Sequence, residues 1–486
     1  MRGKLLPVFV FLLGLSCSVS AQNAKSILQS ATKTMGDVKS IQYSGTGHLG
    51  TLGQAYSPTS PWPENNITAY TRTIEYDSRS AKEDLTQVEP TPIRRGGAAP
   101  FAGEQKQVNL VSSQYAWNQP GNAPQPAIGA AEERQMQIWL TPHGFLKAAM
   151  ESNATAKKGN GGTVVSFMDG KFKVNGTINN QGLVTKTETW LPNTVLGDMP
   201  VETTFSNYRD FNGVKFPATI VQKQGGYPVM DLAVTDARAN VDLNLPVPDA
   251  VRAAKLPPVN VASQKMADGV WFMGGGTHNS VLIEYPNYLV MIEAPNNDAR
   301  SMALIAESKK LVPNKPIKYV INTHHHFDHS GGLRAFVAEG ATIITQEMNK
   351  SYYEQAWKAP RMLDPDRLSQ NPRKATFIGV KDKHVLADGG RSLEIYRIDG
   401  DIHNAGMMMV YLPNEKILVE ADDFVPAPPN SPSAGPRAQA GLVVLYEDLE
   451  RLKLDVATVA PLHAFVVPYS ELQKAATTQV SSLSQK

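Results

Sequence analysis

The stretch THHHFDHSGG, residues 323–332, carries the pattern His-x-His-x-Asp-His. Its ligand-type side chains are His324, His326, Asp328 and His329. Neutral imidazole and carboxylate groups suit zinc and similar divalent cations. A segment this short cannot easily wrap all four around one ion, but it can place two histidines on one ion and pass the others to a neighbouring ion. Because four of the ten histidines fall here, counting His325, the stretch predicts a metal centre rather than a polar loop.

Further ligand-type residues follow in three separate places. His403 lies in GDIHNAG ahead of the apolar run MMMVYL, and His463 lies in VAPLHAF after the apolar run VATVA. Both positions are predicted strand ends, where loops commonly mount functional side chains. The acidic pair Asp422 and Asp423 ends the run KILVEADDF, so one of these carboxylates could bridge two cations.

With these residues in this order, the region from about Ala267 to about Leu472 resembles the metallo-beta-lactamase superfamily of metal-dependent hydrolases. That family carries the same first motif, then a lone His, a Gly-Asp and a late His. The resemblance implies one ion held by His324, His326 and His403. It implies a second ion held by Asp328, His329 and His463, with Asp422 as the bridge. The family's Gly-Asp is Ala421-Asp422 here, so Asp423 stays an alternative bridge, although the offset from the preceding LVE favours Asp422.

The resemblance also implies a mechanism. Two divalent cations are expected, zinc first, with manganese or iron as alternatives. A metal-bound hydroxide would attack the carbonyl of an ester, lactone, thioester or amide, and Asp328 would bind an ion and orient that hydroxide as the catalytic residue. The family's early Asp is replaced by Glu293. Glu293 is expected to hold the loop of residues 323–332, called the metal loop below.

Three alternatives to this function stay open. They are a beta-lactamase, a phosphodiesterase or nuclease, and a metal-bound binding protein without catalysis. The carboxylate at Asp422 disfavours a dedicated beta-lactamase, because those of the family usually lack an Asp there. A small-molecule substrate is expected.

The first 21 residues have a short basic start, an apolar run and a small-residue end, which predicts a signal peptide cleaved after Ala21. The mature protein would then be periplasmic or secreted. Cleavage removes Cys17, the single cysteine, which excludes disulfides and a cysteine-ligated metal site. It also removes Arg2 and Lys4 from the 47 basic residues, so 45 basic residues face 45 acidic ones. A neutral chain gives no support to nucleic acid as a partner.

A chain of 486 residues predicts more than one domain. The Pro- and Ala-rich stretch around 250–262 is typical of a linker, so we expect a β-rich domain over 22–255 and a hydrolase domain over 256–486. The first has hairpin-forming strands interrupted by one helix over 131–150, which predicts a curved antiparallel sheet. The second alternates strands and helices in two halves, as the αβ/βα sandwich of the family requires. The overall class is α+β.

The end of the first domain, from Tyr208 to Leu243, weakly resembles the periplasmic lipoprotein-carrier fold. That resemblance implies a lipid or acyl ligand. The alternative, which we favour, is a role in packing or in shaping the substrate site.

Two segments are candidates for lids over the metals. One covers residues 345–374 and carries Tyr352, Tyr353, Trp357 and Met362, for which simple packing is the alternative. The other covers residues 424–441 and is long for an ordinary connection. His278 falls near the expected pocket and is a candidate for substrate contact, although a structural role is favoured.

Overall fold

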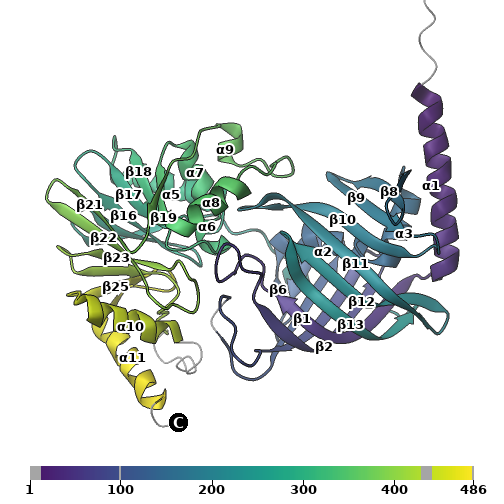
Figure 1. Ribbon diagram of the computed structural model, residues 1–486, viewed down its shortest axis with the longest axis horizontal. Coiled ribbons are helices and arrows are strands. Elements are labelled where there is room, and N and C mark those ends of the chain that lie inside the picture. Colours follow the sequence, from purple (N-terminus) through teal and green to yellow (C-terminus); the bar gives the residue numbers. More distant parts are fainter. Residues whose placement is uncertain (1–12, 98–99, 428–439, 484–486) are drawn as a thin grey trace, which may run out of the picture.

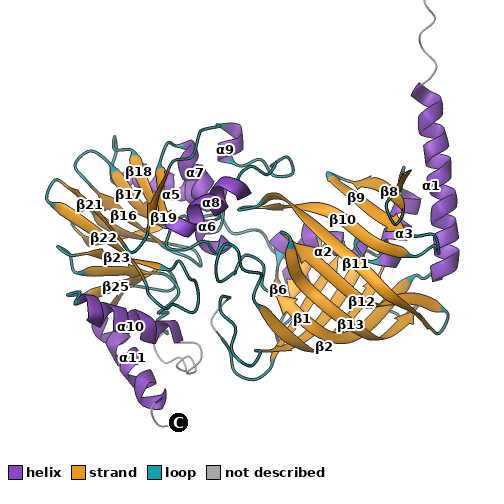
Figure 2. Cartoon of the chain, viewed as in Figure 1, coloured by secondary structure: helices purple, strands orange, loops and turns teal. Residues whose placement is uncertain are grey.

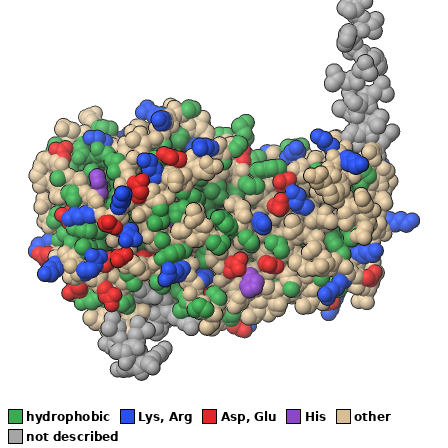
Figure 3. All heavy atoms as spheres, viewed as in Figure 1, with side chains coloured by type: hydrophobic (Ala, Val, Ile, Leu, Met, Phe, Trp, Pro, Cys, Tyr) green, Lys and Arg blue, Asp and Glu red, His purple; other side chains and the backbone are tan. Residues whose placement is uncertain are grey.

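The computed structural model describes residues 13–97, 100–427 and 440–483, and it has two halves that lie side by side (Figure 1). Both halves combine helices and sheets (Figure 2), which confirms the α+β class. Among the described residues, no helix combines the length and the apolar character needed to cross a membrane. Over the face in Figure 3, acidic and basic side chains are interspersed.

The N-terminal half is built on one antiparallel sheet. Its strands are β1 Ser40–Gly50, β2 Glu64–Glu75, β3 Ser80–Val88, β4 Gln105–Ser112, β5 Tyr115–Asn118, β6 Gln125–Pro126, β7 Thr155–Gly159, β8 Gly162–Asp169, β9 Phe172–Ile178, β10 Val184–Asn193, β11 Gly197–Phe211, β12 Val214–Gln224 and β13 Tyr227–Ala239. The order is β6-β5-β4-β3-β2-β1-β13-β12-β11-β10-β9-β8-β7, so every neighbour is a hairpin partner except the pair β1 and β13. That pair joins the first six strands of the sheet to the last seven, and β6 and β7 are its two edges.

Helices cover one side of this curved sheet (Figure 1). They are α1 Leu13–Met35, α2 Ala131–Trp139 and α3 Pro142–Glu151, with a short turn at Ile128–Ala130. Leu28, Met136 and Phe145 from these helices join the apolar core under the sheet. Beyond the last strand, α4 Asp249–Ala253 packs in a separate cluster with Leu110 and Trp117.

The single helix predicted over 131–150 is wrong. It is two helices, because Thr141 is extended (φ −89°, ψ 155°) ahead of Pro142. A proline disfavours helical geometry in the residue that precedes it.

The C-terminal half contains two sheets. The first is mixed and runs in chain order through β14 Ala262–Ala267, β15 Val270–Gly274, β16 Ser280–Glu284, β17 Leu289–Ile292, β18 Ile317–Ile321, β19 Thr342–Gln346 and β20 Phe377–Val380. The second runs through β21 Lys383–Asp388, β22 Arg391–Arg397, β23 Met408–Leu412, β24 Ile417–Glu420, β25 Thr458–Pro461 and β26 Val467–Pro468. Apolar side chains of both sheets meet in one core.

Helices complete this sandwich on its outer faces. They are α5 Asp298–Leu311, α6 Phe327–Ser330, α7 Leu333–Ala338, α8 Glu347–Ala356, α9 Arg367–Gln370, α10 Ala440–Leu452 and α11 Tyr469–Leu483. Leu304 and Phe336, from α5 and α7, pack on the first sheet. Leu445 and Leu472, from α10 and α11, pack in the core shared with the second. The layers are therefore helix, sheet, sheet and helix, as the αβ/βα prediction requires.

Candidate metal centre

The motif of residues 323–332 lies directly after β18, a parallel strand of the first sheet whose last two residues, Val320 and Ile321, are buried. Its last part forms the single turn α6, which turns the chain back toward α7. His324, His326 and His329 are fully buried. The other predicted ligands follow strands of the second sheet, so strand ends from both sheets meet at one edge of the sandwich.

A first cluster consists of His324, His326, His403 and Asp422, whose ligand atoms lie within 4.8 Å of one another. His326 Nε2 donates a hydrogen bond to the carbonyl of Ala55 at 2.9 Å. Its other ring nitrogen, Nδ1, is therefore the atom that can bind a cation. In the described part of the chain, neither His326 Nδ1 nor His324 Nε2 has a hydrogen-bond partner, and both are buried. Buried polar atoms are rarely left unsatisfied, so these two nitrogens fit a cation.

A second cluster consists of His278, Asp328, His329 and His463, again within 4.8 Å. Nε2 of His329 lies 3.1 Å from Nε2 of His463. His278 Nε2 lies 3.2 Å from Asp328 Oδ2. Four ligand-type side chains that converge in this way also fit a divalent cation.

Asp422 lies between the two clusters. Its Oδ1 is 2.9 Å from His329 Nε2 and 3.1 Å from His463 Nε2, and its Oδ2 is 2.9 Å from His403 Nε2. Asp423 instead faces Asp401 and Glu420, and burial, reinforced by these two acidic groups, raises its pKa well above the usual range. Of the acidic pair, Asp422 therefore has the geometry of a bridge.

The histidines of the site differ in the direction in which their surroundings shift the pKa. Burial holds the pKa of His324 and of His326 well below the usual value, so both imidazoles are neutral, as metal ligands must be. For His329, the carboxylates of Asp422 and Glu293 outweigh burial and raise the pKa. Asp422 is itself held ionised, because His329 and His403 lower its pKa well below the usual range against the effect of burial.

Glu293 holds the metal loop from beneath. It has a left-handed backbone (φ 75°) at the end of β17 and no solvent exposure. Its carboxylate accepts from Thr323 Oγ1 at 2.5 Å and from His329 Nδ1 at 3.1 Å. This second bond fixes the tautomer of His329 and leaves Nε2 for a cation.

The aromatic residues predicted as a lid mostly pack instead. Tyr353 is fully buried and donates to Asn322 Oδ1 at 2.6 Å, just ahead of the metal loop. Trp357 packs against it, with ring centroids 5.4 Å apart, and Tyr352 lies against His325. Met362 is 81% exposed. Most of the second lid segment, residues 428–439 of 424–441, lies outside the described residues.

Two residues at the site were not predicted as ligands: His278, predicted as a candidate for substrate contact with a structural role favoured, and Gln54, which was not singled out from the sequence. His278 stands alone ahead of β16, and only the fold brings it to Asp328 and His463. Gln54 lies in the N-terminal half, yet its Nε2 donates to Asp328 Oδ1 at 2.8 Å. Neither spacing nor motif links residue 54 to residue 328, so sequence patterns could not find this contact.

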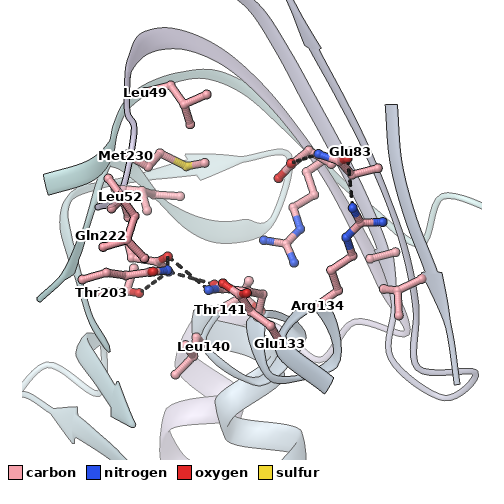
Figure 4. Close-up of a pocket in the computed structure, with 18 of the residues that line it drawn as sticks. Leu49, Leu52, Glu83, Glu133, Arg134, Leu140, Thr141, Thr203, Gln222 and Met230 are labelled. Atoms are coloured by element: carbon pink, nitrogen blue, oxygen red, sulfur yellow. Dashed lines mark hydrogen bonds between the residues drawn. The ribbon is translucent and has the colours of Figure 1, made fainter. Parts of the chain in front are cut away.

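The N-terminal half also contains a cavity of about 400 Å³ (Figure 4). Leu49, Leu52, Leu140 and Met230 supply apolar walls. The polar lining includes Glu83, Glu133, Arg134 and Gln222. A lipid or acyl ligand there stays a prediction, and these groups would have to face polar atoms of any occupant.

Comparison with known proteins identifies the C-terminal half. The Lactamase_B family, described as the metallo-beta-lactamase superfamily, matches residues 273–461. The C-terminal half therefore belongs to the metallo-beta-lactamase superfamily, and this membership indicates a metal-dependent hydrolase.

Two curated relatives match parts of the chain. The alpha subunit of 2,4-dinitroanisole O-demethylase from Nocardioides sp. (strain JS1661) is 25% identical over 197 residues, which cover 40% of this chain and 55% of the relative. A linear primary-alkylsulfatase from Pseudomonas sp. (strain ATCC 19151) is 38% identical over 58 residues, 12% of this chain and 11% of the relative. The chain thus spans about half the length of one relative and a tenth of the other.

Solved structures of metallo-beta-lactamases are similar to the same half. The enzyme from Pontibacter korlensis is 19% identical, with a TM-score of 0.35, and the match covers 45% of this chain and 99% of that one. The enzyme from Hirschia baltica is 22% identical, with a TM-score of 0.35, covering 45% and 98%.

Proposed function

We propose that the protein is a dinuclear metal-dependent hydrolase that cleaves an ester, lactone, thioester or amide. The observation that carries this proposal is the pair of ligand clusters joined by Asp422. The first ion would be held by His324, His326 and His403. The second would be held by Asp328, His329 and His463, and Asp422 would bridge the two.

When bound, such cations lower the pKa of a coordinated water and polarise the bond under attack. The remaining roles belong to the chain. Asp328, as a carboxylate, can accept a hydrogen bond from the attacking water and set its direction, which makes it the proposed catalytic residue. The buried histidines keep their positions through Glu293 and the backbone, so little reorganisation is needed when the substrate reacts.

The exposed side of the site indicates where substrate enters. The side chain of Asp328 is 31% exposed and that of His463 is 23% exposed, whereas those of His324 and His329 are inaccessible. Phe465, two residues after His463, is 40% exposed. A substrate would therefore approach over the second cluster. The exposed apolar side chain of Phe465 is close in sequence to His463 of that cluster.

Export to the periplasm or secretion, with cleavage after Ala21, belongs to the same proposal. The apolar segment and its small-residue end support it. N-terminal sequencing of the protein recovered from the periplasm and the medium would test it. Recovery of the protein from the cytoplasm, with Met1 still present, would contradict it.

Purified protein loaded with zinc is expected to bind two ions per chain, and His326→Ala is expected to lose turnover while keeping its fold. Metal analysis after loading with zinc, manganese or iron would measure the first, and circular dichroism with rate measurements the second.

A panel of ester, lactone, thioester, cephalosporin, phosphodiester, alkyl sulfate and 2,4-dinitroanisole probes would identify the substrate class. A chain that binds none of the three metals would refute the proposal.

A further inference from the structure

The loop after β1 leaves the N-terminal half and contacts the metal loop of the other half. Gln54 Nε2 donates to Asp328 Oδ1 at 2.8 Å, and the Ala55 carbonyl accepts from His326 Nε2 at 2.9 Å. The Gly53 carbonyl accepts from the backbone N–H of Phe327 at 3.2 Å. Three consecutive residues of one domain therefore bond to three consecutive residues of the other.

The same loop contacts the segment that carries His403. The Tyr56 carbonyl accepts from the N–H of Ala405 at 2.8 Å, and the Tyr56 hydroxyl donates to the carbonyl of Asp401 at 3.1 Å. The loop is thus held at two of the ligand-bearing segments.

A second strand connection of the N-terminal half supports this loop. Gly97 N–H donates to the Gln54 carbonyl at 2.8 Å, and Gly96 N–H donates to the carbonyl of Ile402 at 2.9 Å. Arg94 ties this segment to the sheet through Glu89 at 3.1 Å, and both side chains are nearly inaccessible. The loop is therefore built into the fold of its own domain.

We infer that residues 53–56 of the N-terminal domain complete the metal centre by positioning its ligands, an inference that rests on the proposed function. The bond to Ala55 places the proton of His326 on Nε2 and leaves Nδ1 for the first ion. The bond from Gln54 occupies Oδ1 of Asp328 and turns Oδ2 toward the second cluster. Partners of this kind set ligand orientation, and their loss typically weakens metal affinity by about 10- to 100-fold.

Gly53 gives the sharpest test, because it touches the metal loop without being near a ligand atom itself. A Cβ at this position would lie 2.5 Å from the ring of Phe327, between His326 and Asp328. Gly103→Ala is the matched control. Gly103 has nearly the same backbone (φ 73° against 79°), but its Cβ would meet nothing within 4 Å. The strain from a positive φ is therefore similar in the two variants, and Gly53→Ala is the one expected to displace the metal loop.

Gln54→Ala provides a second variant that leaves the backbone unchanged. Its control is Gln42→Ala, which removes a glutamine bonded to Thr73 within the N-terminal sheet. Zinc affinity would be measured for all four variants by competition with a chromogenic chelator, and folding by circular dichroism. Gly53→Ala and Gln54→Ala are expected to bind at least one zinc ion about 10- to 100-fold more weakly than the parent, while both controls match it.

Parental zinc affinity in folded Gly53→Ala and Gln54→Ala would overturn the inference. If Gly53→Ala does not fold, Gln54→Ala alone decides. A parent protein that binds no metal would instead refute the proposed function, so the two failures are distinguishable.

Discussion

His324 and His326, two histidines of the first cluster, each have one ring nitrogen hydrogen-bonded to the protein and one without a hydrogen-bond partner among the described residues. His326 is committed through Ala55, and His324 Nδ1 lies 3.1 Å from Thr323 Oγ1. This arrangement decides which nitrogen can bind a cation before any cation arrives. The choice depends on partners far away in the sequence, so the motif predicts ligand identity but not the ligand atom.

Asp422→Asn is expected to lose most of the turnover and to weaken metal binding, whereas Asp423→Asn is expected to be mild. Of this acidic pair, Asp422 contacts histidines of both clusters, and its neutralisation leaves two neighbouring cations less compensated. Metal content and rate, measured for both variants beside the parent, check this. Greater sensitivity at Asp423 would place the bridge one residue later.

His143 is expected to make the protein less stable in mild acid. Burial lowers its pKa to about 4, so the folded state resists the proton that the unfolded chain accepts near pH 6.5. Its contribution is therefore complete above pH 6.5 and is lost as pH falls toward 4, by at most about 3 kcal/mol. Urea unfolding at pH 7 and pH 5 measures it. His143→Gln should flatten the pH dependence, while His48→Gln, at an exposed position, should leave it unchanged.

At the scale of elements, α8 packs against the strand end that carries the metal loop. Tyr353 donates to Asn322 Oδ1, and Asn322 Nδ2 donates to the His324 carbonyl at 2.6 Å. The segment read as a lid thus supports the site from within. Aromatic spacing alone cannot separate these two roles, because both place large apolar side chains on one helix.

Tyr353→Phe should cost about 1 kcal/mol of unfolding free energy, the value of one buried hydrogen bond. Asn322 Oδ1 keeps Thr345 as a second donor at 3.2 Å, so the loss should stay small. Thermal unfolding compared with Tyr352→Phe, on the same helix, would measure it. Equal stability in both variants would show that the Tyr353 hydroxyl contributes nothing.

The sequence predicted the fold class and seven candidate metal ligands, because ligand-type residues and the ends of strands can be recognised in short stretches of sequence. It did not predict the split at Pro142, although the proline was visible, because the apolar spacing on either side continued. The contacts of Gln54 and His278 depend on how distant segments meet, and no local pattern records them.

At the scale of the whole molecule, the halves share a second contact, made by Arg361 and its neighbours. Arg361, 8% exposed, donates to the carbonyls of Asn193, Thr194 and Val195 at 2.7–3.0 Å. The carboxylate of Asp198 accepts from the backbone N–H groups of Met362 and Leu363. With the loop of residues 53–56, this gives the interface two separate attachments.

Arg361→Ala is expected to destabilise the interface by about 2–4 kcal/mol, since it leaves three backbone carbonyls without their charged donor. Urea unfolding should then separate into two transitions, one for each half. Arg238→Ala, at an exposed residue paired with Asp236, serves as the control. A single unshifted transition in Arg361→Ala would mean that the halves are held by other contacts.

The pairing of β1 with β13 has a consequence for how the protein is made. A ribosome releases residues 40–50 long before residues 227–239, so the first strand must wait for its neighbour. The loop that follows β1 waits longer still, until residues 323–332 have emerged. Contacts of such long sequence separation form slowly. Because His463 is also one of the proposed ligands, a newly made chain is expected to acquire its full metal-binding competence only after residue 463 has been synthesised.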